Sequence, residues 1–423
     1  MLRANLTADD VQRGMKALEP KIQRYARLIM RKGVNVTEGQ EVVISAPVET
    51  CAFARMLVQE AYAAGAGHVT VLWSDDAVTR LTYEHVPLSY FETVPEWKRR
   101  QLDSLAEMGA CFVFVEGADP AALKGIDPAK PAANSRAQNT QCTVFRRGLD
   151  FNINPWCIAG APVEAWAKTV FPHDEPDAAI YRLWCAILSA ARADAENDWG
   201  LHDATFEKNL RLLNDGRFTA LRYTTERGTN LTVGLTDRHI WAGGCSETPT
   251  GHTFFPNIPT EEVFTSPHCE RVDGVVYATM PLIHHGNKVD RFWLRFEAGQ
   301  VVEYDAEVGL DTLRSIIETD EGARHLGEVA LISKNTPIRE SGILFYDTLY
   351  DENASCHLAL GVGFPECYEG GYDLSLEDLR AHGVNTSSTH VDFMIGDDDL
   401  DIVGIHEDGT ETPIFVNGQW SWE

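Results

Sequence analysis

The stretch Tyr350–Gly361 combines acidic and imidazole side chains with an apolar run, and it contains no lysine or arginine. Its ionisable members include Asp351, Glu352 and His357. Burying a carboxylate or an imidazole among apolar residues is costly unless a partner compensates, and a divalent cation is an effective partner. The stretch therefore predicts metal ligands, and the remaining ligands of such a site must come from other parts of the chain.

Other ionisable side chains stand in sequences that are otherwise typical of apolar strands. Glu261 and Glu262 are adjacent, and in an extended chain they point to opposite faces, so that one of them can enter a given site. Glu328 is the only charged residue in the apolar sequence GEVALI. His390 and Asp392 are two residues apart, which puts both side chains on one face of a strand. These residues can complete a ligand set.

Each of these features also has a simpler explanation. A carboxylate at the start of a strand is often exposed, and a His-x-Asp pair can be an imidazole hydrogen-bonded to a carboxylate in a core. Two histidine-containing stretches and separate isolated acids in one half of the chain favour metal binding. The set is one residue of the Glu261–Glu262 pair with Glu328, Glu352, His357, His390 and Asp392. Six mainly oxygen ligands exceed the needs of one tetrahedral zinc and suit two neighbouring divalent ions.

Composition and charge bear on the compartment and the partners. The chain has 423 residues, of which 44% are hydrophobic and 23% charged, as is usual for soluble globular proteins. A net charge of −27 argues against nucleic acid and anionic membranes as partners, because both require a positive surface. No apolar run reaches the length of a membrane span. The nine scattered cysteines include no Cys-x-x-Cys pair, so we expect reduced thiols and a cytoplasmic protein.

The first half of the chain alternates apolar strands with helices, a pattern typical of a parallel sheet with both faces covered. The predicted strands are 41–47, 68–73, 111–116 and 156–159, and the predicted helices are 8–32, 50–64, 95–108, 162–170, 176–193 and 203–214. A glycine-rich phosphate-binding sequence does not follow any of these strands, so a nucleotide site is poorly supported.

From about residue 217 the sequence changes to strands separated by short turns. The predicted strands are 221–225, 231–235, 274–280, 289–296, 300–304, 401–405 and 413–416, with a helix near 308–323. The predicted fold class is therefore α/β. An N-terminal parallel-sheet α/β domain, 1–216, precedes a mainly antiparallel α+β C-terminal domain, 217–423, that carries the metal site.

These stretches together resemble the aminopeptidase T family of dinuclear metallopeptidases, also called thermophilic aminopeptidases. The matching sequences are PNIPTEEVFTSP (256–267), GEVAL (327–331), SGILFYDTLYDENASCHLALG (341–361) and NTSSTHVDFMIG (385–396). The resemblance extends over nearly the whole chain. It implies a metal-dependent aminopeptidase that removes N-terminal residues from peptides, using water or hydroxide activated on two divalent metals such as zinc, cobalt or manganese. It also implies a homodimer.

The resemblance assigns individual residues to the site. The implied metal ligands are Glu262 of PTEEVFT, Glu328 of GEVAL, Glu352 and His357 of DENASCH, and His390 and Asp392 of THVD. A carboxylate must also accept the proton of the attacking water, and Glu328 and Glu261 are the candidates for this catalytic role. One position departs from the family, because Phe364 stands where a catalytic tyrosine is expected. Tyr368 or Tyr346 could supply the missing hydroxyl, or the metals could carry its role alone.

Two alternative functions are also compatible with the sequence. His357, His390 and Asp392 could form the facial triad of an iron-dependent ring-cleaving dioxygenase. Three further carboxylates would then be superfluous, whereas a two-metal hydrolase requires them. The second alternative is a binding protein that keeps the fold without catalysis, which the loss of the tyrosine at Phe364 leaves possible.

Overall fold

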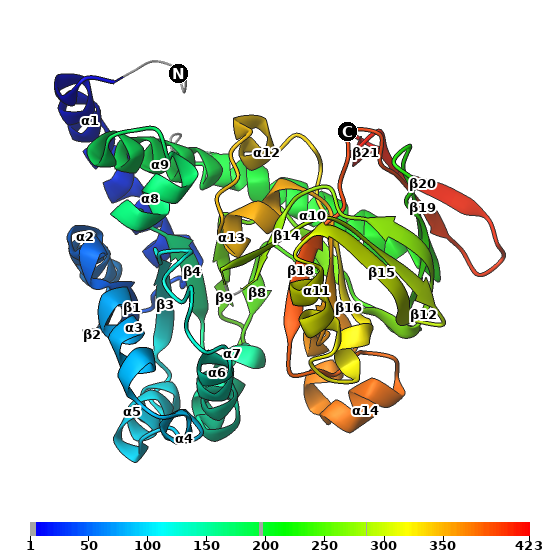
Figure 1. The fold of residues 1–423 in the computed structure, drawn as a ribbon, viewed down its shortest axis with the longest axis horizontal. Helices are drawn as coiled ribbons and strands as arrows, with labels where there is room; N and C mark the ends of the chain where they lie inside the picture. Colours follow the sequence, from blue (N-terminus) through cyan, green and yellow to red (C-terminus); the bar gives the residue numbers. More distant parts are fainter. Residues whose placement is uncertain (1–5, 194–197, 285) are drawn as a thin grey trace. The chain divides into compact units, whose positions relative to one another are not determined.

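The computed structural model describes residues 6–193, 198–284 and 286–423 (Figure 1). The chain forms two compact units. The first contains Met1–Asp198, Cys245–Pro259 and Leu344–Tyr346, and the second contains Trp199–Gly244, Thr260–Ile343 and Asp347–Glu423. Neither unit is one continuous segment, so the predicted domain limits of 1–216 and 217–423 stay a prediction.

The first unit is built on a parallel sheet, which confirms the α/β prediction for this part of the chain. Among the described residues its strand order is β10-β4-β3-β1-β2. The strands are β1 (Glu41–Pro47), β2 (His68–Ser74), β3 (Cys111–Glu116), β4 (Trp156–Gly160) and β10 (Asn257–Ile258). Val42 and Ile44 of β1 are fully buried, as expected for a central strand with covered faces. The two-residue strand β10 carries too little pattern to be predicted.

Helices follow the strands of the first unit, in the blue to green part of Figure 1. They are α1 (Ala8–Leu28), which continues as a π-helical turn (Ile29–Gly33), α2 (Cys51–Ala64), α3 (Asp76–His85), α4 (Leu88–Phe91), α5 (Glu96–Glu107), α6 (Ala129–Gln141), α7 (Thr143–Asp150), α8 (Glu164–Val170) and α9 (Pro176–Ala190). Thr7 and Asp10 form a capping box at the start of α1. A small hairpin, β8 (Ser246–Glu247) with β9 (Thr253–Phe254), also belongs to this unit.

The second unit contains antiparallel sheets, as predicted. The smaller has the strand order β18-β17-β16-β11-β7 in the described part of the chain, and we call it the ligand sheet. Its strands are β7 (Ala242–Gly243), β11 (Val263–Thr265), β16 (Leu326–Leu331), β17 (His357–Gly361) and β18 (His390–Met394). These strands stand side by side in the order in which they occur along the chain.

The larger antiparallel sheet supports the ligand sheet through a shared apolar core. Its strands are β5 (Ala220–Thr224), β6 (Asn230–Leu235), β12 (Pro267–Tyr277), β13 (Leu282–His284), β14 (Asn287–Glu297), β15 (Gln300–Val308), β19 (Asp401–Ile405), β20 (Glu411–Val416) and β21 (Gln419–Trp420). The core joins Tyr223 and Phe292 of this sheet to Leu358 and Phe393 of the ligand sheet.

Short helices complete the second unit. They are α10 (Asp198–Gly216), α11 (Leu310–Ile317), α12 (Pro337–Ser341), α13 (Thr348–Asp351) and α14 (Leu376–Ala381), with 3-10 turns at Gly322–Arg324, Glu352–Ala354, Pro365–Cys367 and Gly371–Asp373. The predicted helix 308–323 is too long, because α11 ends at Ile317 and Asp320 turns to bond a neighbouring loop. Within the residues that the structure describes, every helix is too short or too polar to span a bilayer.

Candidate metal centre

Strand alternation gives the ligand sheet one apolar face and one ionisable face. Leu358 on β17, and Val391 and Phe393 on β18, lie in the apolar core. Successive side chains of a strand point to opposite faces. His390 and Asp392 therefore leave from the other face, as their two-residue spacing predicts.

The register of the strands places the ionisable residues beside one another. Glu328 on β16 pairs with Ala359 on β17, which pairs in turn with Asp392 on β18. His390 pairs with Gly361 across the same two strands. The residue of β17 between Glu328 and Asp392 is Ala359. Its small side chain leaves space between the two carboxylates. This register is a tertiary property that the sequence pattern does not reveal.

A β-bulge at Gly327 directs Glu328 to the ionisable face. The pairing shifts between Leu326 and Glu328, and Leu326 lies in the apolar core although the two residues are only two positions apart. Such a bulge re-aims the side chains that follow it. A Cβ atom at Gly327 would lie 2.4 Å or less from the carbonyl oxygens of Gly361 and Val362, so this position accepts no side chain. The glycine of GEVAL is thus a site residue that sequence reasoning missed.

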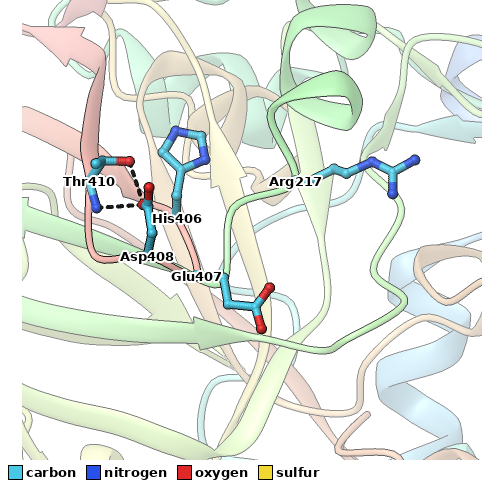
Figure 2. Close-up of a pocket in the computed structure, with 5 residues that line it drawn as sticks. All are labelled: Arg217, His406, Glu407, Asp408 and Thr410. Carbon is cyan, nitrogen blue, oxygen red and sulfur yellow. Dashed lines mark hydrogen bonds between the residues drawn. The ribbon is translucent and has the colours of Figure 1, made fainter.

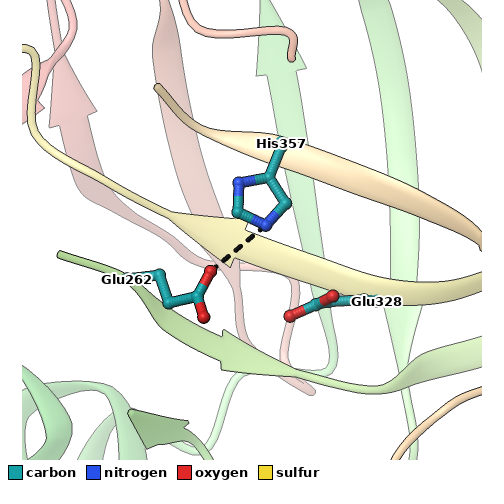
Figure 3. A group of neighbouring side chains, drawn as sticks. All are labelled: Glu262, Glu328 and His357. Carbon is teal, nitrogen blue, oxygen red and sulfur yellow. Dashed lines mark ion pairs between the residues drawn. The ribbon is translucent and has the colours of Figure 1, made fainter. Parts of the chain in front are cut away.

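The ionisable side chains form two overlapping clusters. The first ligand group is Glu262, Glu328 and His357, and the second ligand group is Glu328, His390 and Asp392. Within each group, one potential ligand atom per residue lies within 4.8 Å of the others. Figure 3 shows the first group, in which His357 Nε2 lies 3.3 Å from Glu262 Oε2. Glu328 belongs to both groups.

The second ligand group is equally compact. His390 Nε2 lies 3.1 Å from Glu328 Oε2 and 3.2 Å from Asp392 Oδ1. Glu328, which belongs to both groups, is 4% exposed, so water does little to screen its charge. Five of the six predicted ligands are thus brought together among the described residues.

Backbone carbonyl groups fix the orientation of both imidazoles. His357 Nδ1 lies 3.1 Å from the carbonyl oxygen of Glu352 and 3.2 Å from that of Ser355, and His390 Nδ1 lies 2.8 Å from the carbonyl oxygen of Val362. A carbonyl oxygen only accepts, so Nδ1 carries the proton in each ring. Nε2 is therefore the atom that faces the carboxylates, and either a second proton or a cation must stand between them.

Burial and mutual repulsion alter the acidity of the carboxylates. Burial raises the pKa of Glu328 above its ordinary value, although His390 acts in the opposite direction. Burial, followed by the charge of Glu262, raises the pKa of Glu352 well above its ordinary value. For Asp392, burial acts to raise the pKa, but the neighbouring His390 outweighs it and the pKa is lowered. Burial therefore favours the protonated forms of Glu328 and Glu352, whereas Asp392 is held in its charged form by His390.

The imidazoles respond in the opposite sense. Burial acts to lower the pKa of His357, but the hydrogen bond and charge of Glu262 outweigh it, with further acids adding to them, and raise the pKa to about 10. Burial likewise opposes ionisation of His390, and Asp392 and Glu328 together raise its pKa well above the ordinary value. The buried carboxylates thus require positive charge beside them, which protons on the imidazoles supply in this structure. Divalent cations can supply the same charge, so the residues present fit metal ions.

Among the described residues, neither Glu352 nor Glu261 belongs to the two ligand groups. The Glu352 carboxylate is nevertheless close enough for its pKa to respond to Glu262, Asp392, His357 and Glu328. The Glu261 backbone N–H donates a 2.7 Å hydrogen bond to Asn353 Oδ1. The metal-binding roles of all six residues and the catalytic roles of Glu328 and Glu261 stay predictions.

Phe364, which stands at the expected tyrosine position, packs against the metal centre. Its ring centroid lies 5.0 Å from that of His390 and 5.5 Å from that of Phe264. The ring of Tyr368 instead stacks on His382 at 5.1 Å. Tyr346 belongs to the first compact unit. The aromatic ring beside His390 is thus the one without a hydroxyl group.

A surface pocket elsewhere in the second unit contains none of the predicted ligands (Figure 2). It has a volume of about 490 Å³ and is lined by Arg217, His406, Glu407, Asp408 and Thr410. Asp408 Oδ1 accepts hydrogen bonds from Thr410 N at 2.9 Å and from Thr410 Oγ1 at 2.6 Å. This carboxylate therefore closes its own turn, and the ligand groups remain the better candidate site.

Comparison with known proteins finds relatives over nearly the whole chain. The chain matches the thermophilic metalloprotease (M29) family over residues 18–420. It is 44% identical to aminopeptidase AmpS of Bacillus subtilis over 96% of this chain and 100% of that protein, and 41% identical to aminopeptidase T of Thermus aquaticus over the same shares. The structure of wild-type AmpT from Thermus thermophilus has a TM-score of 0.89 and 39% identity, covering 96% of this chain and 100% of that one.

Proposed function

This chain belongs to the thermophilic metalloprotease (M29) family, and we infer from this that it is a metal-dependent aminopeptidase, a hydrolase that acts on peptides. The observation that carries this conclusion within the molecule is the pair of overlapping ligand groups on one face of the ligand sheet. The ring-cleaving dioxygenase alternative finds no support among the relatives, which are named aminopeptidases.

The centre is proposed to hold a pair of divalent ions, zinc, cobalt or manganese. The overlap of the groups supports this number, because a carboxylate such as Glu328 has two oxygen atoms and can bind a cation with each. Glu262 and His357 would hold one ion, His390 and Asp392 the other, and Glu328 both. Glu352 would add a further carboxylate. When bound, such ions act as Lewis acids that make water a nucleophile near neutral pH.

The protein's own residues would orient the substrate and move protons. The free α-amine of a peptide could bind near a metal ion or a carboxylate of the centre, which would favour cleavage at the N-terminal residue. A carboxylate must take the proton of the attacking water and return it to the leaving amine. Glu328 and Glu261 are the candidates, and Glu328 is the more constrained because it belongs to both ligand groups.

The assembly and location of the protein are proposals of the same kind. A homodimer follows from the family resemblance, and a cytoplasmic location is proposed from the scattered cysteines, which fit reduced thiols. Peptides with a free N-terminus are the proposed substrates, and neither nucleic acid nor membrane is a proposed partner.

The proposal is tested by metal analysis together with hydrolysis assays. Protein stripped with a chelator is reloaded separately with Zn²⁺, Co²⁺ or Mn²⁺, and the bound metal is measured by plasma mass spectrometry. We expect about two ions per chain, as in two-metal hydrolases, and hydrolysis of leucine-p-nitroanilide. N-acetyl-leucine-p-nitroanilide, which lacks the free amine, should not be cleaved. Binding of a single iron ion without hydrolysis would contradict the proposal.

A further inference from the structure

We propose that two hydrogen-bonded clamps outside the ligand set, Asn353 and Asp320, position the two ligand groups separately, so that each clamp sets the affinity of one metal ion. This inference rests on the proposed two-metal function. Neither residue is proposed to touch the reacting atoms, so both are positioning residues.

Asn353 ties together the segments that precede Glu262 and His357, two members of the first ligand group. Its side chain is fully buried. Asn353 Oδ1 accepts a hydrogen bond from the Glu261 backbone N–H at 2.7 Å, and Nδ2 donates to the Leu349 carbonyl oxygen at 2.8 Å. One loop leads directly into Glu262, and the other lies just before His357. A single amide thus fixes the separation of two segments that are far apart in the chain.

The peptide before Glu262 is held on both sides of the Asn353 contact. His202 Nε2 donates to the carbonyl oxygen of Thr260 at 2.7 Å, and His202 itself is 8% exposed. Beyond Glu262, Val263 pairs with Leu331 of β16. The attachments at Thr260, Glu261 and Val263 therefore leave the Glu262 carboxylate little freedom to move away from His357.

Asp320 performs the corresponding task for the second ligand group. Its Oδ2 accepts from the Ser388 backbone N–H at 2.7 Å and from Ser388 Oγ at 2.6 Å, while Oδ1 accepts from Ser387 Oγ at 2.7 Å and from the Ala323 backbone N–H at 2.9 Å. Ser388 stands two residues before His390. Asp320 therefore anchors the loop from which the strand with His390 and Asp392 begins.

Positioning has a large effect in this centre because its acids repel one another. The carboxylates of the ligand groups are buried close together, and a loop that is released can relax by moving its acid outward. Partners that hold metal ligands in place are typically worth about 10- to 100-fold in metal affinity. Since Asn353 and Asp320 contact different loops, the loss of each should weaken the binding of a different ion.

The test measures each metal affinity in a protein with only one ligand group intact. Asp392→Asn keeps the first group, and Glu262→Gln keeps the second. Co²⁺ affinity is measured by competition with a chromophoric chelator, and the visible spectrum of bound Co²⁺ reports its coordination. In the Asp392→Asn protein, Asn353→Ala should weaken binding about 10- to 100-fold and Asp320→Ala about twofold or less. In the Glu262→Gln protein the order should reverse.

Controls separate positioning from general damage to the fold. Asn154→Ala removes a buried asparagine of the first unit, whose Nδ2 donates to the carbonyl oxygens of Ala106 and Ala110. It should lower Tm without changing either metal affinity. If Asn353→Ala does not fold, His202→Phe releases the same peptide at Thr260 while keeping an aromatic ring, and it should also weaken the first group.

The outcomes distinguish this inference from the proposed function. Equal weakening of both groups by each clamp variant, or affinities that stay within twofold of the parent protein, would overturn the clamp assignment. Wild-type protein that binds fewer than two ions would instead overturn the two-metal function, whatever the clamp variants do.

Discussion

At the scale of single residues, the backbone decides which nitrogen of each imidazole faces the metal centre. The carbonyl groups of Glu352 and Ser355 accept from His357 Nδ1, and that of Val362 accepts from His390 Nδ1. Both rings therefore present Nε2 to the carboxylates before any cation binds. Such preorganisation reduces the loss of freedom on binding. The sequence predicted the two histidines, whereas these carbonyl partners depend on folding.

The two candidates for the catalytic base are separated by comparing glutamine variants. Glu328→Gln should reduce both metal content and kcat, because Glu328 belongs to both ligand groups. Glu261→Gln should keep the metal content and lower kcat by about 10²- to 10⁴-fold, the usual contribution of a general base. Plasma mass spectrometry and leucine-p-nitroanilide turnover give the two quantities. Glu303→Gln, at an exposed surface residue, serves as the control. Normal turnover of Glu261→Gln would remove Glu261 from the mechanism.

A hydroxyl group on the ring of Phe364 should raise activity. This ring packs 5.0 Å from His390, and a donor that stabilises a developing oxyanion is typically worth about 10²–10³ in rate. Phe364→Tyr is therefore expected to increase kcat by about tenfold or more at equal metal content. Phe264→Tyr adds the same group one ring farther from His390 and should leave kcat unchanged. An unchanged kcat in Phe364→Tyr would mean that the centre has no use for this hydroxyl.

At the scale of elements, local pattern predicted strands well and their arrangement poorly. The predicted strands 41–47 and 111–116 coincide with β1 and β3, because continuous apolar runs are typical of buried parallel strands. The short strands β7 and β10 contain two residues each and have no readable period. Their existence depends on neighbouring strands that only the folded chain supplies.

In the candidate site, too, the local pattern predicted some features correctly and could not predict others. The spacing of His390 and Asp392 predicted a common face correctly. The face of Glu328 depends on a bulge at Gly327, and strict alternation would have placed Glu328 on the same side as Leu326, which lies in the core. Asn353 and Asp320 could not be recognised either, because their partners lie far away in the sequence. The sequence showed only that an asparagine stands inside a predicted metal-binding stretch, whereas its burial and its bond to the Glu261 backbone came from the structure.

The two faces of β17 should respond differently to mutation. Leu358→Ala removes apolar contacts from the core and should lower the free energy of unfolding by about 2–5 kcal/mol. The metal affinity of the folded Leu358→Ala protein should stay close to that of the parent protein. Ala359→Val fills the space between Glu328 and Asp392, so it should reduce metal affinity strongly while costing about 1–3 kcal/mol of stability. Chemical denaturation and Co²⁺ titration measure both effects. Equal loss of metal in both variants would contradict this division.

At the scale of the whole molecule, the acids of the centre belong to a strongly acidic chain with a net charge of −27. This charge opposes the gathering of Glu262, Glu328 and Asp392 in one place. A large apolar core that includes both antiparallel sheets of the second unit holds them together. Bound cations would remove the repulsion, so the stability of the second unit should depend on metal.

Metal removal should therefore lower the thermal stability of the second unit. A ligand that binds only the folded state stabilises it by about 2.7 kcal/mol for each site at a free concentration of 100 times Kd. Calorimetry of chelator-treated and reloaded protein should show a higher Tm with metal. Protein with Glu328→Gln, which weakens both sites, should show a much smaller increase. An equal increase in that variant would indicate stabilisation by metal bound elsewhere.

The order of strands in the ligand sheet has a consequence for when activity arises. The strands β7, β11, β16, β17 and β18 lie side by side in the same order as along the chain. The first ligand group is available once β17 has joined, but His390 and Asp392 arrive only with the edge strand β18. If the proposed two-metal centre is required for activity, a growing chain would gain it only when almost all of the chain has been synthesised.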